Sequence, residues 1–239
     1  MTKNRIWELD ALRGLCIIGM VVFHLIYDMT VLYRLVAWKL PPFWDAVQLA
    51  GGVVFLMLSG LCITLGHHCV RRGLIVLGSG LLCTLVTAGM AHFGYAANSV
   101  VIRFGVLHCL GLCMLLWPLF RKLPTWALAL LGAIIIAAGW YISANHIRTQ
   151  LQWLYPLGIT YPGFTSGDYF PLLPSMGWFL LGAVFGRTVY RSKESLLPKV
   201  NSQAPILRFL GFCGRHSLWI YLLHQPLLSG ILSLVILLK

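Results

Sequence analysis

Long runs of apolar residues, separated by short polar segments, follow one another along most of the chain. Each run is 18 to 24 residues long, and a helix of about 20 apolar residues crosses the hydrocarbon core of a bilayer. The pattern therefore predicts an all-α fold, a polytopic membrane bundle with seven spanning helices. The predicted spans are 12–32, 43–66, 74–93, 101–120, 125–142, 170–190 and 218–238, with a shorter interfacial helix at 204–214.

The composition supports a membrane protein with one domain. Apolar residues make up 59% of the 239 residues and charged residues only 10%, whereas a soluble domain carries about 25% charged residues. This excludes a soluble enzyme, a disordered chain and a nucleic-acid-binding domain. Because no internal repeat or linker divides residues 1–239, we expect a single domain. The first run lacks a small-residue cleavage site, so we expect it to remain as a membrane anchor.

The distribution of Lys and Arg predicts the orientation. If the N-terminus is cytoplasmic, 13 of the 18 Lys and Arg fall on the inner side and 5 on the outer side. The positive-inside rule then predicts a cytoplasmic N-terminus and an outer C-terminus. The inner set is Lys3, Arg5, Arg13, Arg71, Arg72, Arg121, Lys122, Arg187, Arg191, Lys193, Lys199, Arg208 and Arg215, and the outer set is Arg34, Lys39, Arg103, Arg148 and Lys239.

The seven cysteines predict neither disulfides nor a metal site. They lie mostly within apolar runs and form no CxxC pair, which is typical of small residues that fill a core. Cys109 and Cys113 are four residues apart beside His108, but no second pair of ligands follows them. We therefore expect no metal.

The first span contains a histidine and an aspartate on one helical face. His24 lies about 18 Å along the helix from Leu12, just past the middle of the membrane. Asp28 follows at i+4, where a carboxylate can orient the imidazole for general base catalysis. The alternative is a structural hydrogen-bonded pair that ties two helices together. Ionisable residues inside the membrane are costly, which favours the functional interpretation.

Two other spans place histidines inside the membrane. His108 follows Arg103 in the fourth run, and His224 precedes Gln225 and Pro226 in the last run. We expect the histidines of the three spans to surround one cavity. His108, His224 and Gln225 are candidates to donate hydrogen bonds to a developing oxyanion.

The two membrane faces offer further candidate sites. Arg71 and Arg72, next to two histidines at the inner end of the third span, suit either membrane anchoring or the binding of phosphates. The long outer loop 143–169 is rich in aromatic residues and proline, and it carries Asp168 and Tyr169 near its end. This loop suits either a sugar or amine acceptor, or a cap over the bundle.

Four segments together resemble a known family. They read ELDALRGLCIIGMVVFHLIYD, RFGVLHCLGLCMLL, DYFPLLPSMGWFLLGAVFG and LGFCGRHSLWIYLLHQPLL, in order from Glu8 to Leu228. They resemble the catalytic-domain family of heparan-α-glucosaminide N-acetyltransferase. Arg13 and His24, with ten residues between them, are also similar to the arginine–histidine motif of membrane O-acyltransferases.

The resemblance implies a transmembrane acetyltransferase. Such an enzyme takes acetyl from cytosolic acetyl-CoA and places it on a glycan or aminosugar across the bilayer, with an amine favoured over a hydroxyl. Loop 33–42 contains no His, so the resemblance assigns the general base to His24. The candidate catalytic residues are His24, Asp28 and His224; those for the cofactor are Arg13, Arg71, Arg72, His108, His216, Ser217, Tyr221 and Gln225; those for the acceptor are Arg103, Asp168 and Tyr169.

Other classes of function remain as alternatives. A proton-coupled transporter of a small solute also uses intramembrane His and Asp, but it would need no acyl-CoA. A non-catalytic assembly subunit would tolerate substitution of His24 and His224. For the enzyme we expect a multi-pass protein of a bacterial inner membrane. The sequence is compatible with direct transfer and with an acetyl-histidine intermediate. It is also compatible with a monomer and with a homodimer.

Overall fold

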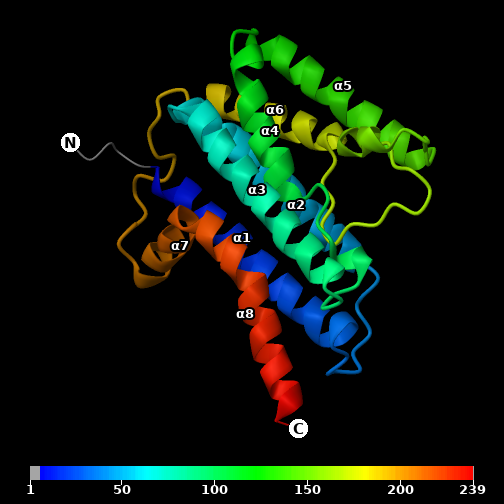
Figure 1. The fold of residues 1–239 in the computed structure, drawn as a ribbon. Coiled ribbons are helices and arrows are strands. Elements are labelled where there is room, and N and C mark those ends of the chain that lie inside the picture. Colours follow the sequence, from blue (N-terminus) through cyan, green and yellow to red (C-terminus); the bar gives the residue numbers. More distant parts are fainter. Residues whose placement is uncertain (1–5, 239) are drawn as a thin grey trace. The chain divides into compact units, whose positions relative to one another are not determined.

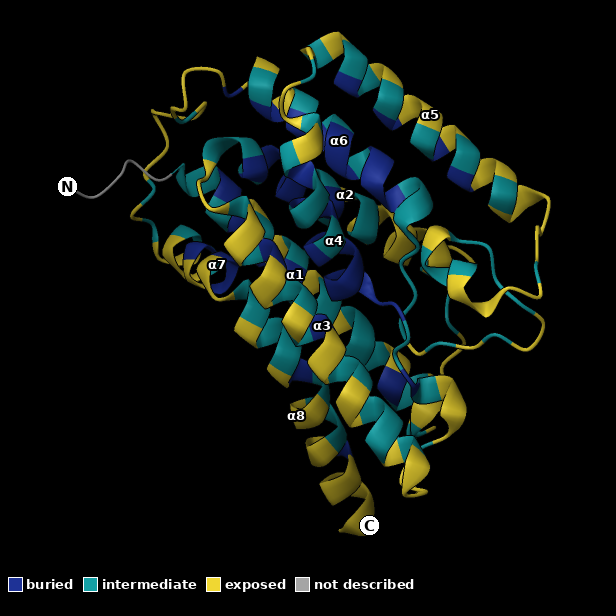
Figure 2. Ribbon diagram, turned by 45° about the horizontal axis from the view of Figure 1, so that its top comes forward, coloured by how far each residue is buried: buried dark blue, intermediate teal, exposed yellow. Residues whose placement is uncertain are grey.

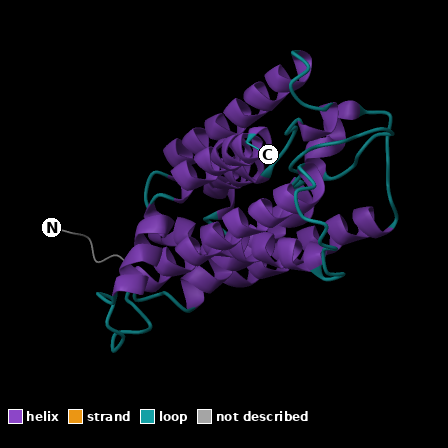
Figure 3. Ribbon diagram, turned by 90° about the horizontal axis from the view of Figure 1, so that it is seen from below, coloured by secondary structure: helices purple, strands orange, loops and turns teal. Residues whose placement is uncertain are grey.

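The chain folds almost entirely into helices. The computed structural model describes residues 6–238, so the predicted cations Lys3, Arg5 and Lys239 lie outside the described residues. The structure is 71% helical, and residues 6–238 form no strand, as Figures 1 and 3 show. The predicted all-α helical membrane bundle is confirmed.

Each predicted run contains a helix. The long helices are α1 (Trp7–Tyr27), α2 (Trp44–Leu65), α3 (Cys69–His92), α4 (Val106–Phe120), α5 (Thr125–Ala144), α6 (Leu172–Thr188) and α8 (Ser217–Leu237). The predicted short helix is α7 (Pro205–Arg215), and brief helical turns are η1 (Asp28–Leu32), η2 (Asn98–Val100) and η3 (Gln152–Leu157). Helix α4 begins later than predicted, because Gly105 is extended and Phe104 forms a backbone bridge with Tyr169.

Five helical segments of the described chain are long and apolar enough to cross a membrane. They are Trp7–Leu32, Trp44–Leu65, Cys69–His92, Thr125–Ala144 and Ser217–Leu237. The apolar helix α4 has 15 residues and α6 has 17, which correspond to about 22 and 26 Å of rise. For these two helices, spanning stays a prediction.

The residues form two compact units, which are described separately. The terminal unit comprises the described residues up to Phe55 and from Ser192 onward; the central unit is Leu56–Arg191. The first half of α2 therefore belongs to the terminal unit and the second half to the central unit. The single domain expected from the sequence stays a prediction.

In the terminal unit, α1 packs along α7 and also contacts α8. Glycines permit the close approach of α1 and α7. A Cβ at Gly14 would collide with the carbonyl of Leu210, and a Cβ at Gly214 would collide with the carbonyl of Asp10. Small residues of this kind let membrane helices approach at backbone distance.

In the central unit, α3 packs on α4, α5 packs on α6, and α4 also contacts α6. Glycines again permit close contacts, since a Cβ at Gly60 would collide with the carbonyl of Phe179. Phe179 and Leu180 are fully buried. Exposed residues follow the outer faces of α5 and α8 in Figure 2, and many of these residues are large and apolar. Apolar outer faces suit contact with lipid.

Candidate functional site

Two of the predicted histidines lie together in the terminal unit. The ring centroids of His24, on α1, and His224, on α8, are 5.0 Å apart, with the ring planes inclined by 55°. His224 is buried and His24 is half-buried. The fold therefore places side by side two imidazoles whose residues are 200 positions apart in the sequence.

Backbone carbonyl groups fix the tautomers of both rings. Nδ1 of His24 lies 3.0 Å from the carbonyl oxygen of Met20, and Nδ1 of His224 contacts the carbonyl oxygen of Tyr221. A carbonyl group only accepts hydrogen bonds, so Nδ1 carries the proton in each ring. Nε2 of each neutral ring therefore keeps its lone pair. Within residues 6–238, neither Nε2 atom has a hydrogen-bond partner.

Asp28 contacts a different partner from the one that its spacing predicts. Its side chain is only 2% exposed, and Oδ2 accepts a hydrogen bond of 2.8 Å from Nε2 of Gln225. Met20, rather than Asp28, holds the ring of His24 in place. Asp28 also begins the π-helical turn η1, and such turns often occur at functional sites. The expectation that Asp28 orients His24 through a direct hydrogen bond is corrected accordingly.

Three other candidates lie along the first turns of α8. The ring of Tyr221 is 5.5 Å from that of His224. Ser217 is the first residue of α8, and the exposed His216 precedes it with its ring 4.5 Å from that of Phe212. His216 is about 12 Å from His224 along the helix axis. Tyr221 therefore belongs beside the histidine pair, whereas His216 and Ser217 lie at the end of α8 that joins α7.

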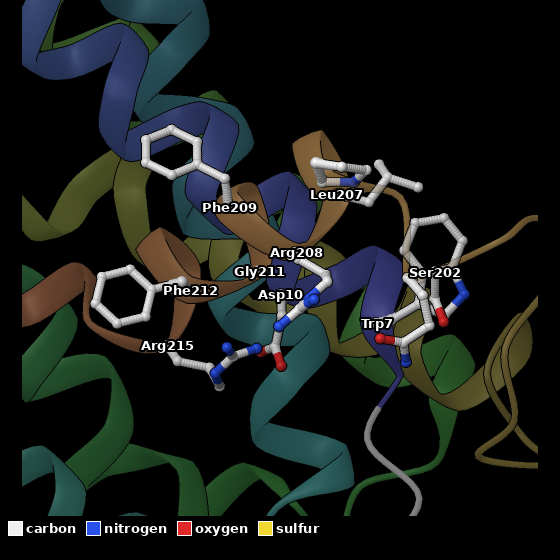
Figure 4. Close-up of a pocket in the computed structure, with 11 residues that line it drawn as sticks. Trp7, Asp10, Ser202, Leu207, Arg208, Phe209, Gly211, Phe212 and Arg215 are labelled. Carbon is white, nitrogen blue, oxygen red and sulfur yellow. The ribbon is translucent and has the colours of Figure 1, made fainter.

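A cavity of about 730 Å³ lies between α7 and the first turns of α1, as Figure 4 shows. Its volume is in the range of small-molecule sites. Arg208 and Arg215 provide two cations and Asp10 one carboxylate, beside the aromatic rings of Trp7, Phe209 and Phe212. The other residues that line it are Ser202, Gln203, Pro205, Leu207 and Gly211.

This cavity was not predicted from the sequence. Its signal is the amphipathic pattern of α7, in which Arg208 and Arg215 are seven residues apart and lie near each other on the helix. The predicted cofactor residues are elsewhere. Arg13 is on α1 but does not line the cavity, and Arg71 and Arg72 are in the first turn of α3 in the central unit.

In the central unit, His108 has both ring nitrogens engaged. Nδ1 accepts a hydrogen bond of 3.2 Å from the backbone N–H of Gly105, so the proton resides on Nε2. Nε2 donates to Oγ1 of Thr84 at 3.1 Å, and that hydroxyl donates to the carbonyl of Ile102 at 2.6 Å. This arrangement joins α3 to the start of α4. The predicted meeting of His108 with the other two histidines stays a prediction.

The three predicted acceptor residues lie together in the central unit, within hydrogen-bonded loop structure. Nε of Arg103 donates to the carbonyl of Thr165 at 3.0 Å, and Oδ2 of Asp168 accepts from the backbone N–H of Val106 at 3.0 Å. The hydroxyl of Tyr169 donates to the carbonyl of Tyr155 at 2.7 Å. These bonds hold the end of loop 143–169 against the start of α4.

Tyr169 is the residue of this loop with a strongly altered acidity. Burial, with a smaller contribution from the neighbouring Tyr155, raises the pKa of Tyr169 to about 12. The hydroxyl therefore remains protonated at neutral pH and keeps its role as donor. The ring of Phe164 lies 4.9 Å from that of Tyr169 and 5.5 Å from that of Tyr155, so aromatic packing adds to the order of the loop.

The helical bundle defines an integral membrane protein, and its histidine pair is the candidate catalytic site. Comparison with known families matches residues 5–226 to the family described as heparan-alpha-glucosaminide N-acetyltransferase, catalytic. The chain belongs to this family, as its sequence resemblance implies, and the family is one of membrane acetyltransferases. Neither the curated proteins nor the solved structures contain a match to the chain.

Proposed function

We propose that the protein transfers acetyl from cytosolic acetyl-CoA to the amine of an aminosugar on the opposite side of the membrane, with His24 as the general base. The observation that carries this proposal is the pair formed by His24 and His224. Each imidazole is anchored through Nδ1 and leaves Nε2 without a hydrogen-bond partner in the described chain. Two such groups inside a membrane-embedded unit suit proton transfer to and from a substrate.

The reaction requires one proton acceptor and one leaving group. The amine nitrogen attacks the thioester carbonyl carbon while Nε2 of His24 takes a proton from the amine. The bond between carbon and sulfur then breaks, and the CoA thiolate receives the proton from His24. The products are the amide and CoA, so atoms and charges balance. His224 acts beside His24, and the Asp28–Gln225 pair forms the adjoining wall of the site.

The cavity beside α7 suits the nucleotide part of the donor. Arg208 and Arg215 can bind phosphate groups, and Trp7 or Phe209 offers an aromatic surface to adenine. From Asp10, at the cavity, to His24 is about 21 Å along α1. The extended pantetheine arm of CoA would bridge this distance. Arg13 lies along this path, and Arg71 and Arg72 add to the basic inner face in the proposed orientation.

The acceptor would approach from the outer side. In the orientation with a cytoplasmic N-terminus, loop 143–169 faces outward and places Arg103, Asp168 and Tyr169 there. Its clustered aromatic rings suit the apolar face of a sugar. The proposal includes a bacterial inner membrane as the location and residues 1–239 as one domain.

The test is transfer of labelled acetyl by the purified protein in vesicles. We expect labelled acetyl-CoA and glucosamine to give labelled N-acetylglucosamine and one equivalent of CoA. Exclusion of acetyl-CoA from the face that carries the N-terminus should abolish the reaction. Absence of acetyl transfer, or transport of sugar without acetyl-CoA, would contradict the proposal.

A further inference from the structure

Gln225 presents a buried oxygen without a hydrogen-bond partner at the edge of the histidine pair. Its Nε2 donates to Oδ2 of Asp28, whereas its Oε1 is buried and has no partner within the described chain. Removing such an acceptor from water without giving it a new hydrogen bond destabilises the folded state. Folded proteins contain few of them, and each one calls for an explanation.

The orientation of this amide follows from its neighbour. Oδ2 of Asp28 accepts the hydrogen bond from Nε2 of Gln225, so the NH₂ group of Gln225 faces Asp28. The reversed amide would place two oxygens against each other. Asp28 thus keeps Oε1 directed away from the carboxylate, where it is ready to accept another hydrogen bond.

The position of Gln225 connects this oxygen with the proposed chemistry. Gln225 follows His224, whose ring is 5.0 Å from that of His24. Its partner Asp28 is one helical turn from His24. The second buried side-chain atom without a partner in residues 6–238, Nε1 of Trp44, belongs to a ring stacked on Phe23 at 4.3 Å. Both unpaired atoms therefore belong to side chains that contact a residue within about one turn of His24, namely Asp28 or Phe23.

A primary amine and a hydroxyl differ in how they satisfy two acceptors. A neutral primary amine has two N–H groups and offers one to Nε2 of His24 and one to Oε1 of Gln225. Its lone pair then remains for attack on the thioester. A hydroxyl has one O–H group, so it leaves one of the two acceptors unpaired. Sites that bind a substrate N–H discriminate strongly against analogues that lack it.

We infer that Gln225 Oε1 accepts the second N–H of a primary-amine acceptor and thereby selects amines over hydroxyls. The inference rests on the proposed acetyl transfer and assigns its specificity to one atom. Gln225 contacts the reacting amine, and Asp28 is a positioning residue that fixes the direction of the amide.

The test is the Gln225→Met variant of the full chain, assayed in vesicles with labelled acetyl-CoA. Glucosamine supplies an amine, whereas glucose carries a hydroxyl at the same position. We expect the kcat/KM for the amine sugar, divided by that for the hydroxyl sugar, to fall about tenfold. Tenfold corresponds to the upper end of the usual net contribution of one neutral hydrogen bond. The KM for acetyl-CoA should stay unchanged. Gln48→Met, an exposed position in the same unit, should leave both values unchanged.

Asp28→Asn provides a second variant with little change in shape. Because an asparagine amide can both donate and accept, it no longer imposes one orientation on Gln225, and selectivity should fall here too. An unchanged ratio in folded Gln225→Met or Asp28→Asn protein overturns the inference while leaving acetyl transfer in place.

Thermal stabilisation by each sugar in the presence of CoA gives a readout that does not depend on turnover. We expect glucosamine, but not glucose, to stabilise the wild type, and Gln225→Met to remove that difference. This binding result supports the inference whether or not the wild type transfers acetyl. Absence of acetyl transfer by the wild type would contradict the proposed function instead. A wild type that neither sugar stabilises and that acetylates neither overturns both.

Discussion

At the scale of single residues, the three histidines that the sequence predicts inside the membrane have different surroundings. His24 and His224 use Nδ1 for a backbone carbonyl and keep Nε2 unpaired, whereas His108 uses both nitrogens in bonds to Gly105 and Thr84. An imidazole with both nitrogens engaged ties helices together, whereas one with a lone pair can move a proton. The geometry therefore favours His24 and His224 for chemistry, and a structural role for His108.

Removal of the Thr84 hydroxyl tests this difference. Thr84→Val leaves Nε2 of His108 and the carbonyl of Ile102 without their shared partner, so we expect a loss of about 1–3 kcal/mol in the free energy of unfolding. This should appear as a lower midpoint of thermal unfolding in detergent, with kcat within about twofold of wild type. Thr188→Val, at an exposed position, is the control. A large loss of kcat in stable protein would indicate that His108 takes part in the reaction.

The residues of the site were predictable in part. Each histidine stands out in its apolar run, and the sequence resemblance points to His24. The partner of Asp28 was not predictable in the same way. Spacing along α1 shows that Asp28 and His24 share a face, but it does not show that Gln225, 197 residues later, supplies a competing donor. Unpaired atoms such as Oε1 of Gln225 become visible only once all neighbours are placed.

At the scale of elements, glycines decide how closely helices approach. Gly214 of α7 lies against the carbonyl of Asp10 on α1, whereas the space around Gly230 of α8 is open. The run lengths predicted the helices themselves, because lipid requires backbone groups to pair within each segment. The start of α4 was missed because the mostly apolar segment 101–105 is not helical. Val101 and Gly105 are extended, and Phe104 pairs with Tyr169, which is distant in sequence.

A leucine at each of these glycines tests the packing of α1 on α7. Gly214→Leu must push the two helices apart, and we expect a loss of about 1–3 kcal/mol in stability. Gly230→Leu meets no neighbouring atoms and improves helix propensity by up to about 1 kcal/mol, so it should be neutral or stabilising. Thermal unfolding of both variants in the same detergent measures the difference. Equal midpoints would contradict the close contact.

At the scale of the whole molecule, the excess of Lys and Arg has two consequences. The uneven distribution of these cations between the two sides predicts the orientation. Two of the cations, Arg208 and Arg215, line the cavity beside α7. The sequence predicts that Arg208 and Arg215 lie on the inner side, but not that they line one cavity. The location requires the contact between α1 and α7, which joins segments about 200 residues apart.

Neutralisation of this cavity tests its role in donor binding. In the double variant Arg208→Gln/Arg215→Gln, two charge-assisted contacts with phosphate are lost, so we expect the KM for acetyl-CoA to rise at least about tenfold. The kcat should change little, because neither arginine is near the histidine pair. Arg191→Gln, an exposed cation on the predicted inner side, serves as the control. An unchanged KM would place the CoA phosphates elsewhere.

The most direct test of the central claim is acetyl transfer by His24→Ala in vesicles, compared with wild type and with the exposed His92→Ala. Loss of a general base lowers kcat by about 10²–10⁴-fold, and His24→Ala should show this loss while keeping the thermal unfolding midpoint of the wild type. His92→Ala should retain full activity. Wild-type turnover by folded His24→Ala protein would contradict the assignment of His24 as the general base.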